Sequence, residues 1–224
     1  MRFFRTVGYV LLAIVFLIPH PLSAADAALD RVTFFGDSTM AHLAVRGGIP
    51  CSRVWSGAAG TVLFETVNEI RCVHLADEGC DVTLRDAVAR KRPGILVITV
   101  GVSGGAGLMP KARFQEIYRE MIRSVREASP TTVLLIQSIL PLSDRSVLHY
   151  KRLTREAVLD ANGWIQEVCR ETGVPYLDTH SVLVDPATGY LKREYQNDEY
   201  MHLTASAYAV MLSHIRERML SLGY

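Results

Sequence analysis

The residues Gly36-Asp37-Ser38-Thr39 follow an apolar run at 32–35 and precede a stretch with helical spacing of apolar residues. This pattern predicts a strand, a turn and a helix that begins near Ser38. Free backbone N–H groups and the helix dipole favour negative charge at a helix N-terminus. Ser38 is therefore a candidate nucleophile whose own N–H can stabilise the oxyanion formed on attack. The structural alternative is that Ser38 only caps the helix, because serine is a preferred capping residue.

A serine nucleophile needs a general base and a group that orients this base. His202 stands in the segment 197–204, directly before the last predicted helix. Glu199 precedes it by three residues, so its carboxylate can reach Nδ1 of the imidazole and leave Nε2 facing a nucleophile. Asp198 is the neighbouring candidate for this role. Taken by itself, the segment is also explained by a solvated acidic turn that flanks a helix.

Two turns rich in small residues also follow predicted strands and can supply donors for the oxyanion. In the turn at 56–61, the N–H of Gly60 can approach a ligand closely because glycine carries no side chain. The turn at 101–107 lacks the Gly-Lys-Ser/Thr sequence of a P-loop and the glycine spacing of a dinucleotide fingerprint. Neither nucleotide-binding pattern is therefore supported.

These candidate residues are separated by alternating strand-like and helix-like segments. The predicted strands are 32–35, 53–55, 95–100, 132–137 and 174–177. Apolar residues at helical spacing predict helices around 63–70, 84–92, 114–125, 149–171 and 204–220. Such alternation predicts a parallel sheet covered by helices on both faces. The loops after its strands should then meet at one crevice, where ligands bind in such sheets.

The chain has 224 residues, of which 49% are apolar, and a formal net charge of +1. This length allows one substantial core, and the charge gives no sign of a nucleic-acid groove. Arg2 and Arg5 precede an apolar run at 7–18, which prolines and small residues follow. This is the pattern of a secretory signal peptide over residues 1–25, cleaved near 24–27, that leaves a single domain over 26–224. The alternative, an uncleaved anchor, is disfavoured because the run is short for a membrane span.

We therefore expect an exported protein, periplasmic or secreted, without stable membrane association after cleavage. Export would permit disulfides among the four cysteines, Cys51, Cys72, Cys80 and Cys169. Cys72 and Cys80 flank a predicted loop and could close a short ring, although the sequence does not determine the pairing. None of the four lies in a close cluster with histidine, so no zinc site is predicted. No metal or organic cofactor is expected.

The order of these motifs along the chain resembles the SGNH, or GDSL-type, esterase/lipase family over nearly the whole predicted mature chain. The resemblance implies an α/β fold, a flavodoxin-like three-layer αβα arrangement with a five-stranded parallel sheet. It also implies a catalytic triad with Ser38 as nucleophile and His202 as base. The oxyanion donors it implies are the N–H groups of Ser38 and Gly60.

The chain departs from the family pattern at two positions. The family's Asp-x-x-His aligns the triad acid with Glu199, while Asp198 is one residue out of register but carries the usual side chain. Of the two, we favour Glu199 as the acid. The family's Gly-x-Asn-Asp is Gly101-Val102-Ser103-Gly104 here, so Ser103 replaces an asparagine donor. A hydroxyl can donate to the oxyanion, but it reaches less far than a carboxamide.

The resemblance implies a serine esterase that hydrolyses a carboxylic ester through an acyl-enzyme on Ser38. Because no lipid-binding surface is evident, we expect a small-molecule or glycan ester, such as an acetyl group on a carbohydrate. Two alternatives stay open. Ser103 also lies in a Gly-x-Ser-x-Gly pattern, as the nucleophile of α/β-hydrolases does, although glycines and Pro110 delay the next helix. Alternatively, the chain is a degenerate member that binds a glycan or acylated ligand without turnover.

Overall fold

The computed structural model describes residues 28–224, and the predicted signal peptide lies outside these residues. One sheet of parallel strands forms the centre of the fold, in the order β2-β1-β5-β6-β7. Its strands are β1 (Val32–Gly36), β2 (Val54–Trp55), β5 (Ile95–Thr99), β6 (Val133–Gln137) and β7 (Tyr176–Leu177). The predicted five-stranded parallel sheet is therefore confirmed.

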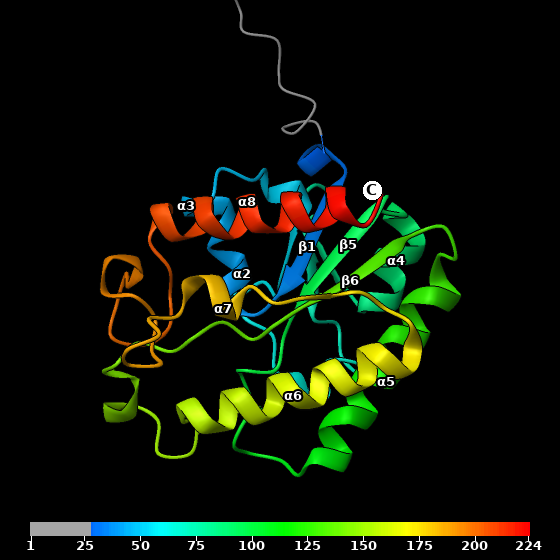
Figure 1. The fold of residues 1–224 in the computed structure, drawn as a ribbon. Helices are drawn as coiled ribbons and strands as arrows, with labels where there is room; N and C mark the ends of the chain where they lie inside the picture. The colour runs from blue at the N-terminus through cyan, green and yellow to red at the C-terminus, as the bar shows by residue number, and fades with distance from the viewer. Residues whose placement is uncertain (1–27) are drawn as a thin grey trace, which may run out of the picture.

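Helices cover both faces of this sheet, which gives the predicted three layers (Figure 1). One face carries α4 (Leu84–Lys91), α5 (Lys111–Ala128) and α6 (Arg155–Thr172). The other carries α2 (Ser38–Ala41), α3 (Leu43–Arg46), α7 (His180–Leu183) and α8 (Ala205–Ser221). Successive strand side chains point to opposite faces, so Phe34 packs with the α8 layer and Phe35 with the α5 layer.

The helix after the first strand and the last helix of the described chain meet beside the sheet. The hydroxyl of Tyr208 on α8 donates to the carbonyl oxygen of Thr39 on α2, and both residues are buried. Figure 1 shows the blue α2 close to the red α8, although they lie at opposite ends of the chain. Within residues 28–224, no helix is long and apolar enough to cross a membrane.

Capping side chains determine where two helices begin. Thr204 caps α8 by accepting the N–H of Ala207, and this helix starts where the sequence predicts. By contrast, α6 begins at Arg155 rather than near residue 149, because Thr154 is its cap and accepts the N–H of Ala157 at 3.1 Å. Residues 149–154 form no helix, and a short 3-10 turn, η3 (Ser146–Leu148), lies directly before them.

The predicted helix at 63–70 is not formed. Only a 3-10 turn, η2 (Phe64–Thr66), lies there, because the N–H of Phe64 donates to the carbonyl oxygen of Ser103 at 2.8 Å. An antiparallel pair of strands follows, β3 (Val73–Leu75) and β4 (Cys80–Val82). This pair was not predicted, because a strand of three residues is too short to show alternation of apolar and polar side chains. The remaining 3-10 turns are η1 (Cys51–Arg53) and η4 (Arg193–Tyr195).

All four cysteines are free thiols in this structure, so the ring that Cys72 and Cys80 could close is not formed. The thiol of Cys72 is buried and donates to the carbonyl oxygen of Val67 at 3.4 Å. Burial raises the pKa of Cys72 to about 11 and that of Cys169 to about 12. Both thiols are therefore protonated near neutral pH, as expected of cysteines that fill the core.

Candidate active site

The turn after β1 holds Ser38 at the carboxyl edge of the sheet. Gly36 ends the strand, and a Cβ at this position would lie 2.3 Å from the carbonyl oxygen of Thr99. Asp37, not Ser38, caps α2, because its carboxylate accepts the N–H and the hydroxyl of Thr39 at 3.1 and 2.8 Å. The hydroxyl of Ser38 is therefore not used for capping, and Ser38 stands at the first position of the helix.

Ser38, His202 and Asp198 form one hydrogen-bonded chain. The Oγ of Ser38 lies 3.0 Å from Nε2 of His202, and Nδ1 of the same ring bonds to Oδ2 of Asp198. His202 comes from the loop directly before α8, so residues 164 positions apart in the sequence meet here. This is the arrangement in which a base can take a proton from a serine while a carboxylate orients the imidazole.

The structure corrects the predicted preference for Glu199 over Asp198. Asp198 bends the loop as an Asx-turn, since its Oδ1 accepts the backbone N–H of Tyr200 at 2.9 Å and that of His202 at 3.3 Å. The turn aims Oδ2 at the imidazole. The next side chain, Glu199, contacts Arg145 and lies 3.5 Å from Nε2 of His149 instead. The tendency of aspartate to form Asx-turns is the sequence signal that favours Asp198.

The environment of Asp198 keeps it ionised. Burial opposes the charge, but hydrogen bonds from the His202 side chain and from the backbone amides of Tyr200 and His202 lower its pKa below the usual value. An ionised Asp198 stabilises the imidazolium that would form when His202 accepts a proton.

Behind Ser38, the carboxyl group of Asp37 is buried. Burial raises its pKa to about 6, although hydrogen bonds from Thr39 and the backbone amide of Ser103 act in the opposite direction. Asp37 therefore links the Ser38 turn to the loop after β5. This loop carries Ser103 to the same edge of the sheet.

The two remaining predicted oxyanion donors differ in their availability. The N–H of Gly60 donates to the carbonyl oxygen of Gly57 at 2.7 Å, so this donor is already used by its own turn, in which Gly60 has φ +73°. The hydroxyl of Ser103 has no hydrogen-bond partner among residues 28–224 and can donate to a ligand. The N–H of Ser38 has no acceptor within its helix, because it belongs to the first turn.

The structure does not support Ser103 as a nucleophile. A nucleophile elbow needs a helix directly after the serine, but turns follow Ser103 and α5 begins only at Lys111. The ring nitrogen that could serve as base, Nε2 of His202, faces Ser38.

Sequence reasoning missed His42, which lies beside the candidate base. Its ring centroid is 4.5 Å from that of His202, and the planes are tilted by 59°. Burial, and then the neighbouring His202 and Arg46, lower the pKa of His42. The lowered pKa favours the neutral form of His42, whose ring packs against that of His202. Its position one helical turn after Ser38 is the signal that could have revealed it.

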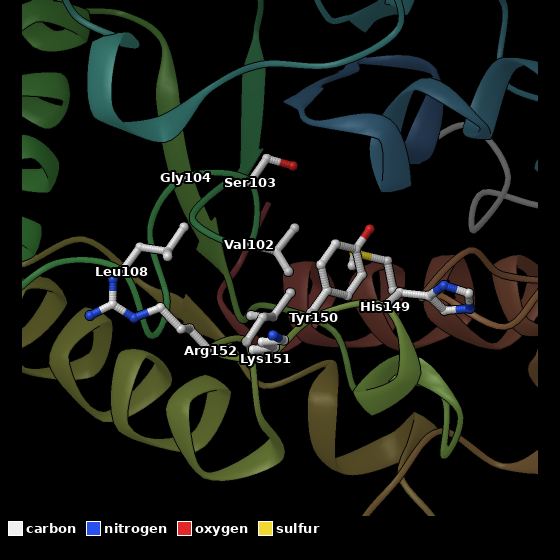
Figure 2. Close-up of a pocket in the computed structure, with 10 residues that line it drawn as sticks. Val102, Ser103, Gly104, Leu108, His149, Tyr150, Lys151 and Arg152 are labelled. Atoms are coloured by element: carbon white, nitrogen blue, oxygen red, sulfur yellow. The ribbon is translucent and has the colours of Figure 1, made fainter.

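A cavity of about 360 Å³ opens beside Ser103 (Figure 2). Its walls come from the loop after β5, from residues 149–153, and from Met201, the neighbour of His202. It is therefore well placed to take up one part of a ligand attacked by Ser38. In the described part of the chain, no three histidine, cysteine or acidic side chains gather into a group that could hold a metal ion.

Comparisons with known proteins show the family and the fold of this chain. The model of the GDSL-like lipase/acylhydrolase family matches residues 34–210, which include Ser38, Asp198 and His202. A GDSL-like lipase from Bacteroides thetaiotaomicron has a similar structure, with a TM-score of 0.60 and 13% identity, over 85% of this chain and 88% of that chain. A search of curated proteins found no match.

Two further solved structures share this fold and carry names that refer to carbohydrate. The periplasmic domain of a lipopolysaccharide acetyltransferase from Salmonella ser. Paratyphi A gives a TM-score of 0.55 at 17% identity, over 89% of each chain. A carbohydrate esterase family 3 protein from Talaromyces cellulolyticus gives a TM-score of 0.52 at 13% identity, over 85% of this chain and 96% of that chain. At these identities, the likeness establishes a common fold.

Proposed function

Because this chain belongs to the GDSL-like lipase/acylhydrolase family, we propose that it is an ester hydrolase with Ser38 as nucleophile, His202 as base and Asp198 as the acid. The observation that carries the proposal is the continuous contact from Ser38 Oγ through both ring nitrogens of His202 to Asp198. This arrangement is the working unit of a serine hydrolase.

In the first half of the reaction, Ser38 Oγ attacks the carbonyl carbon of the ester while Nε2 of His202 accepts the hydroxyl proton. The carbonyl oxygen becomes an oxyanion, which the N–H of Ser38 and the hydroxyl of Ser103 stabilise. As the C–O bond to the alcohol breaks, His202 returns the proton to the departing oxygen. The product of this half-reaction is an acyl group on Ser38.

In the second half, water takes the place of the alcohol. His202 removes a proton from the water, and the resulting hydroxide attacks the acyl carbon. The bond to Ser38 breaks, its oxygen regains the proton from His202, and the carboxylic acid leaves. No metal or organic cofactor takes part in these steps.

For the substrate, we favour a short acyl ester, such as an acetyl group on a carbohydrate. Support comes from the names of the two carbohydrate-related structures that share the fold.

For the location, the basic and apolar pattern of residues 1–25 supports export to the periplasm or the exterior.

A fluorophosphonate probe tests the nucleophile directly, because it forms a covalent bond only with an activated serine. We expect mass spectrometry of the full chain to place the label on Ser38, and Ser38→Ala to abolish both labelling and hydrolysis of a short aryl ester. Ser103→Ala is the matched control and should still be labelled. Label on Ser103 would transfer the role to that residue. Absence of label and hydrolysis, together with ligand binding, would favour a binding protein without turnover.

A further inference from the structure

The cavity beside Ser103 has an apolar lining with two cations at its edge. Val102, Leu108, Leu153 and Met201 supply the apolar surface, while Lys151 and Arg152 supply the positive charges. Figure 2 shows Lys151 and Arg152 on the side of the cavity away from Ser103. None of the lining residues is an aspartate or a glutamate, so the positive charge is not balanced within the cavity.

Both cations are available to a ligand. Neither Lys151 nor Arg152 forms an ion pair with any residue in the range 28–224, and both are exposed. The two nearby acidic residues of the loop at 197–202 are already engaged. Asp198 contacts His202, and Glu199 contacts Arg145 and His149. No ion pair within residues 28–224 therefore compensates the charge of these two cations, which lie at the edge of the cavity that Ser103 and Met201 also line.

The segment that carries these cations is tied to the loop that carries the base. Ser143 donates its N–H to the carbonyl oxygen of Tyr200 at 3.1 Å and its hydroxyl to that of Glu199 at 2.6 Å. The Glu199 carboxylate bonds Arg145, and the His149 ring lies 4.2 Å from the Tyr200 ring. We call these contacts the Ser143–Tyr200 latch. They join the segment that leads to Lys151 and Arg152 to the loop that carries His202.

We propose that the ester cleaved at Ser38 carries an anionic group, a carboxylate or a phosphate, which Lys151 and Arg152 bind at the edge of this cavity. The proposal rests on the proposed function and adds the substrate class. The planar guanidinium of Arg152 can donate two parallel hydrogen bonds to such a group, and Lys151 adds a second charge. The apolar lining accommodates the short carbon chain that separates the anion from the ester. A cavity of about 360 Å³ lies within the size range of sites for small ligands.

Two matched pairs of esters test this proposal and distinguish the two possible places of the anion. In the first pair, para-nitrophenyl hydrogen adipate carries a carboxylate on the acyl side, and para-nitrophenyl methyl adipate is its neutral counterpart. In the second pair, para-acetoxyphenyl phosphate carries the anion on the alcohol side, and para-methoxyphenyl acetate is neutral. The measured quantity is the ratio of kcat/KM for the anionic and the neutral member of each pair.

We expect the wild-type ratio to be about tenfold or more in favour of the anion in at least one pair, and to decrease as salt is added. The variant Lys151→Gln/Arg152→Gln should bring that ratio to about one. Arg123→Glu is the control for a change of surface charge. It lies towards the C-terminal end of α5, which leads back to the opposite edge of the sheet, and it should retain the wild-type ratio.

Other outcomes overturn the proposal in distinguishable ways. Hydrolysis of the neutral esters without preference for either anion would leave the proposed function intact and refute the anionic substrate. An anion preference that persists in the double variant would refute the role of Lys151 and Arg152. Failure to cleave any of the esters, combined with no fluorophosphonate label on Ser38, would refute the proposed function and this inference with it.

Discussion

Ser38 and Ser103 follow the neighbouring parallel strands β1 and β5, and both are partly buried near the carboxyl edge of the sheet. Their surroundings differ in two respects. Ser38 starts a helix and faces a histidine, whereas Ser103 starts a series of turns and its hydroxyl has no partner within the described chain. A serine thus becomes a candidate nucleophile through the base that faces it, and glycines around a serine do not suffice.

The same contrast is repeated one residue apart in the loop that supplies the base. Asp198 points inward to His202, and Glu199 points outward to Arg145 and His149. We assign the first carboxylate to the proposed triad, whereas the second contacts the segment that leads to the cavity lining. Variants of these paired residues test both differences.

Among variants that retain Ser38, the largest effect is expected at Asp198. Asp198→Asn retains the shape of the side chain but removes the charge that orients and stabilises His202. We expect kcat for a short aryl ester to fall on the order of 10³–10⁴-fold. Glu199→Gln, the matched control, should lower kcat less than about threefold, since an exposed ion pair contributes little. Steady-state kinetics measure both, and an equal loss in the two variants would refute the distinction between the carboxylates.

Asp37, the residue before Ser38, should make the free energy of unfolding depend on pH. Its native pKa, about 6, lies above the ordinary value of 3.8. The native protein therefore binds more protons than the unfolded chain within this window, and ionisation of Asp37 lowers stability as pH rises through it. Asp37→Asn cannot ionise and still caps α2. Its free energy of unfolding relative to wild type should rise by on the order of 3 kcal/mol between about pH 4 and pH 7.

Urea denaturation at a series of pH values measures this difference. A difference that stays constant across the window would mean that the Asp37 carboxyl ionises as easily in the native protein as in the unfolded chain.

Ser103 should affect the rate as a hydrogen-bond donor. Ser103→Ala removes the hydroxyl that we assign to the oxyanion, and kcat should fall about ten- to hundredfold, towards the lower end of such losses. Ser103→Asn supplies a carboxamide donor and should be faster than Ser103→Ala. Since asparagine cannot act as this nucleophile, activity in Ser103→Asn also separates the donor role from the nucleophile role. An inactive Ser103→Asn that is folded but unlabelled by fluorophosphonate would contradict the donor role.

The smallest effect is expected at the contact between Glu199 and Arg145, which is one part of the Ser143–Tyr200 latch. Glu199→Ala should raise KM for the preferred anionic ester about two- to fivefold with little change in kcat, because it loosens the cavity wall but leaves His202 in place. Arg145→Ala should have the same effect, and the double variant should add nothing further. Additive losses would show that the two side chains act separately.

Much of the fold could be predicted from local patterns. The sequence of residues 95–99 predicts a buried strand because its side chains are β-branched or apolar on both faces. The start of the last helix could be predicted because Thr204 is a good capping residue. By contrast, residues 63–70 have helical spacing but do not form the predicted helix, since Phe64 bonds to Ser103 across the fold. The 3-10 turn there depends on a contact between distant residues.

In the candidate site too, some features could be predicted from local sequence and others depend on contacts between distant residues. The residue types and their order were enough to single out Ser38 and His202, because a strand–turn–helix pattern and a histidine before the last helix are local features. Three-dimensional placement determined that Asp198 meets the imidazole and that the Gly60 amide is used by its own turn. It also determined that Lys151 and Arg152, which form no ion pair within residues 28–224, border the cavity. Backbone form follows largely from neighbouring residues, whereas the partner of a polar side chain depends on what the folded chain brings within hydrogen-bond distance.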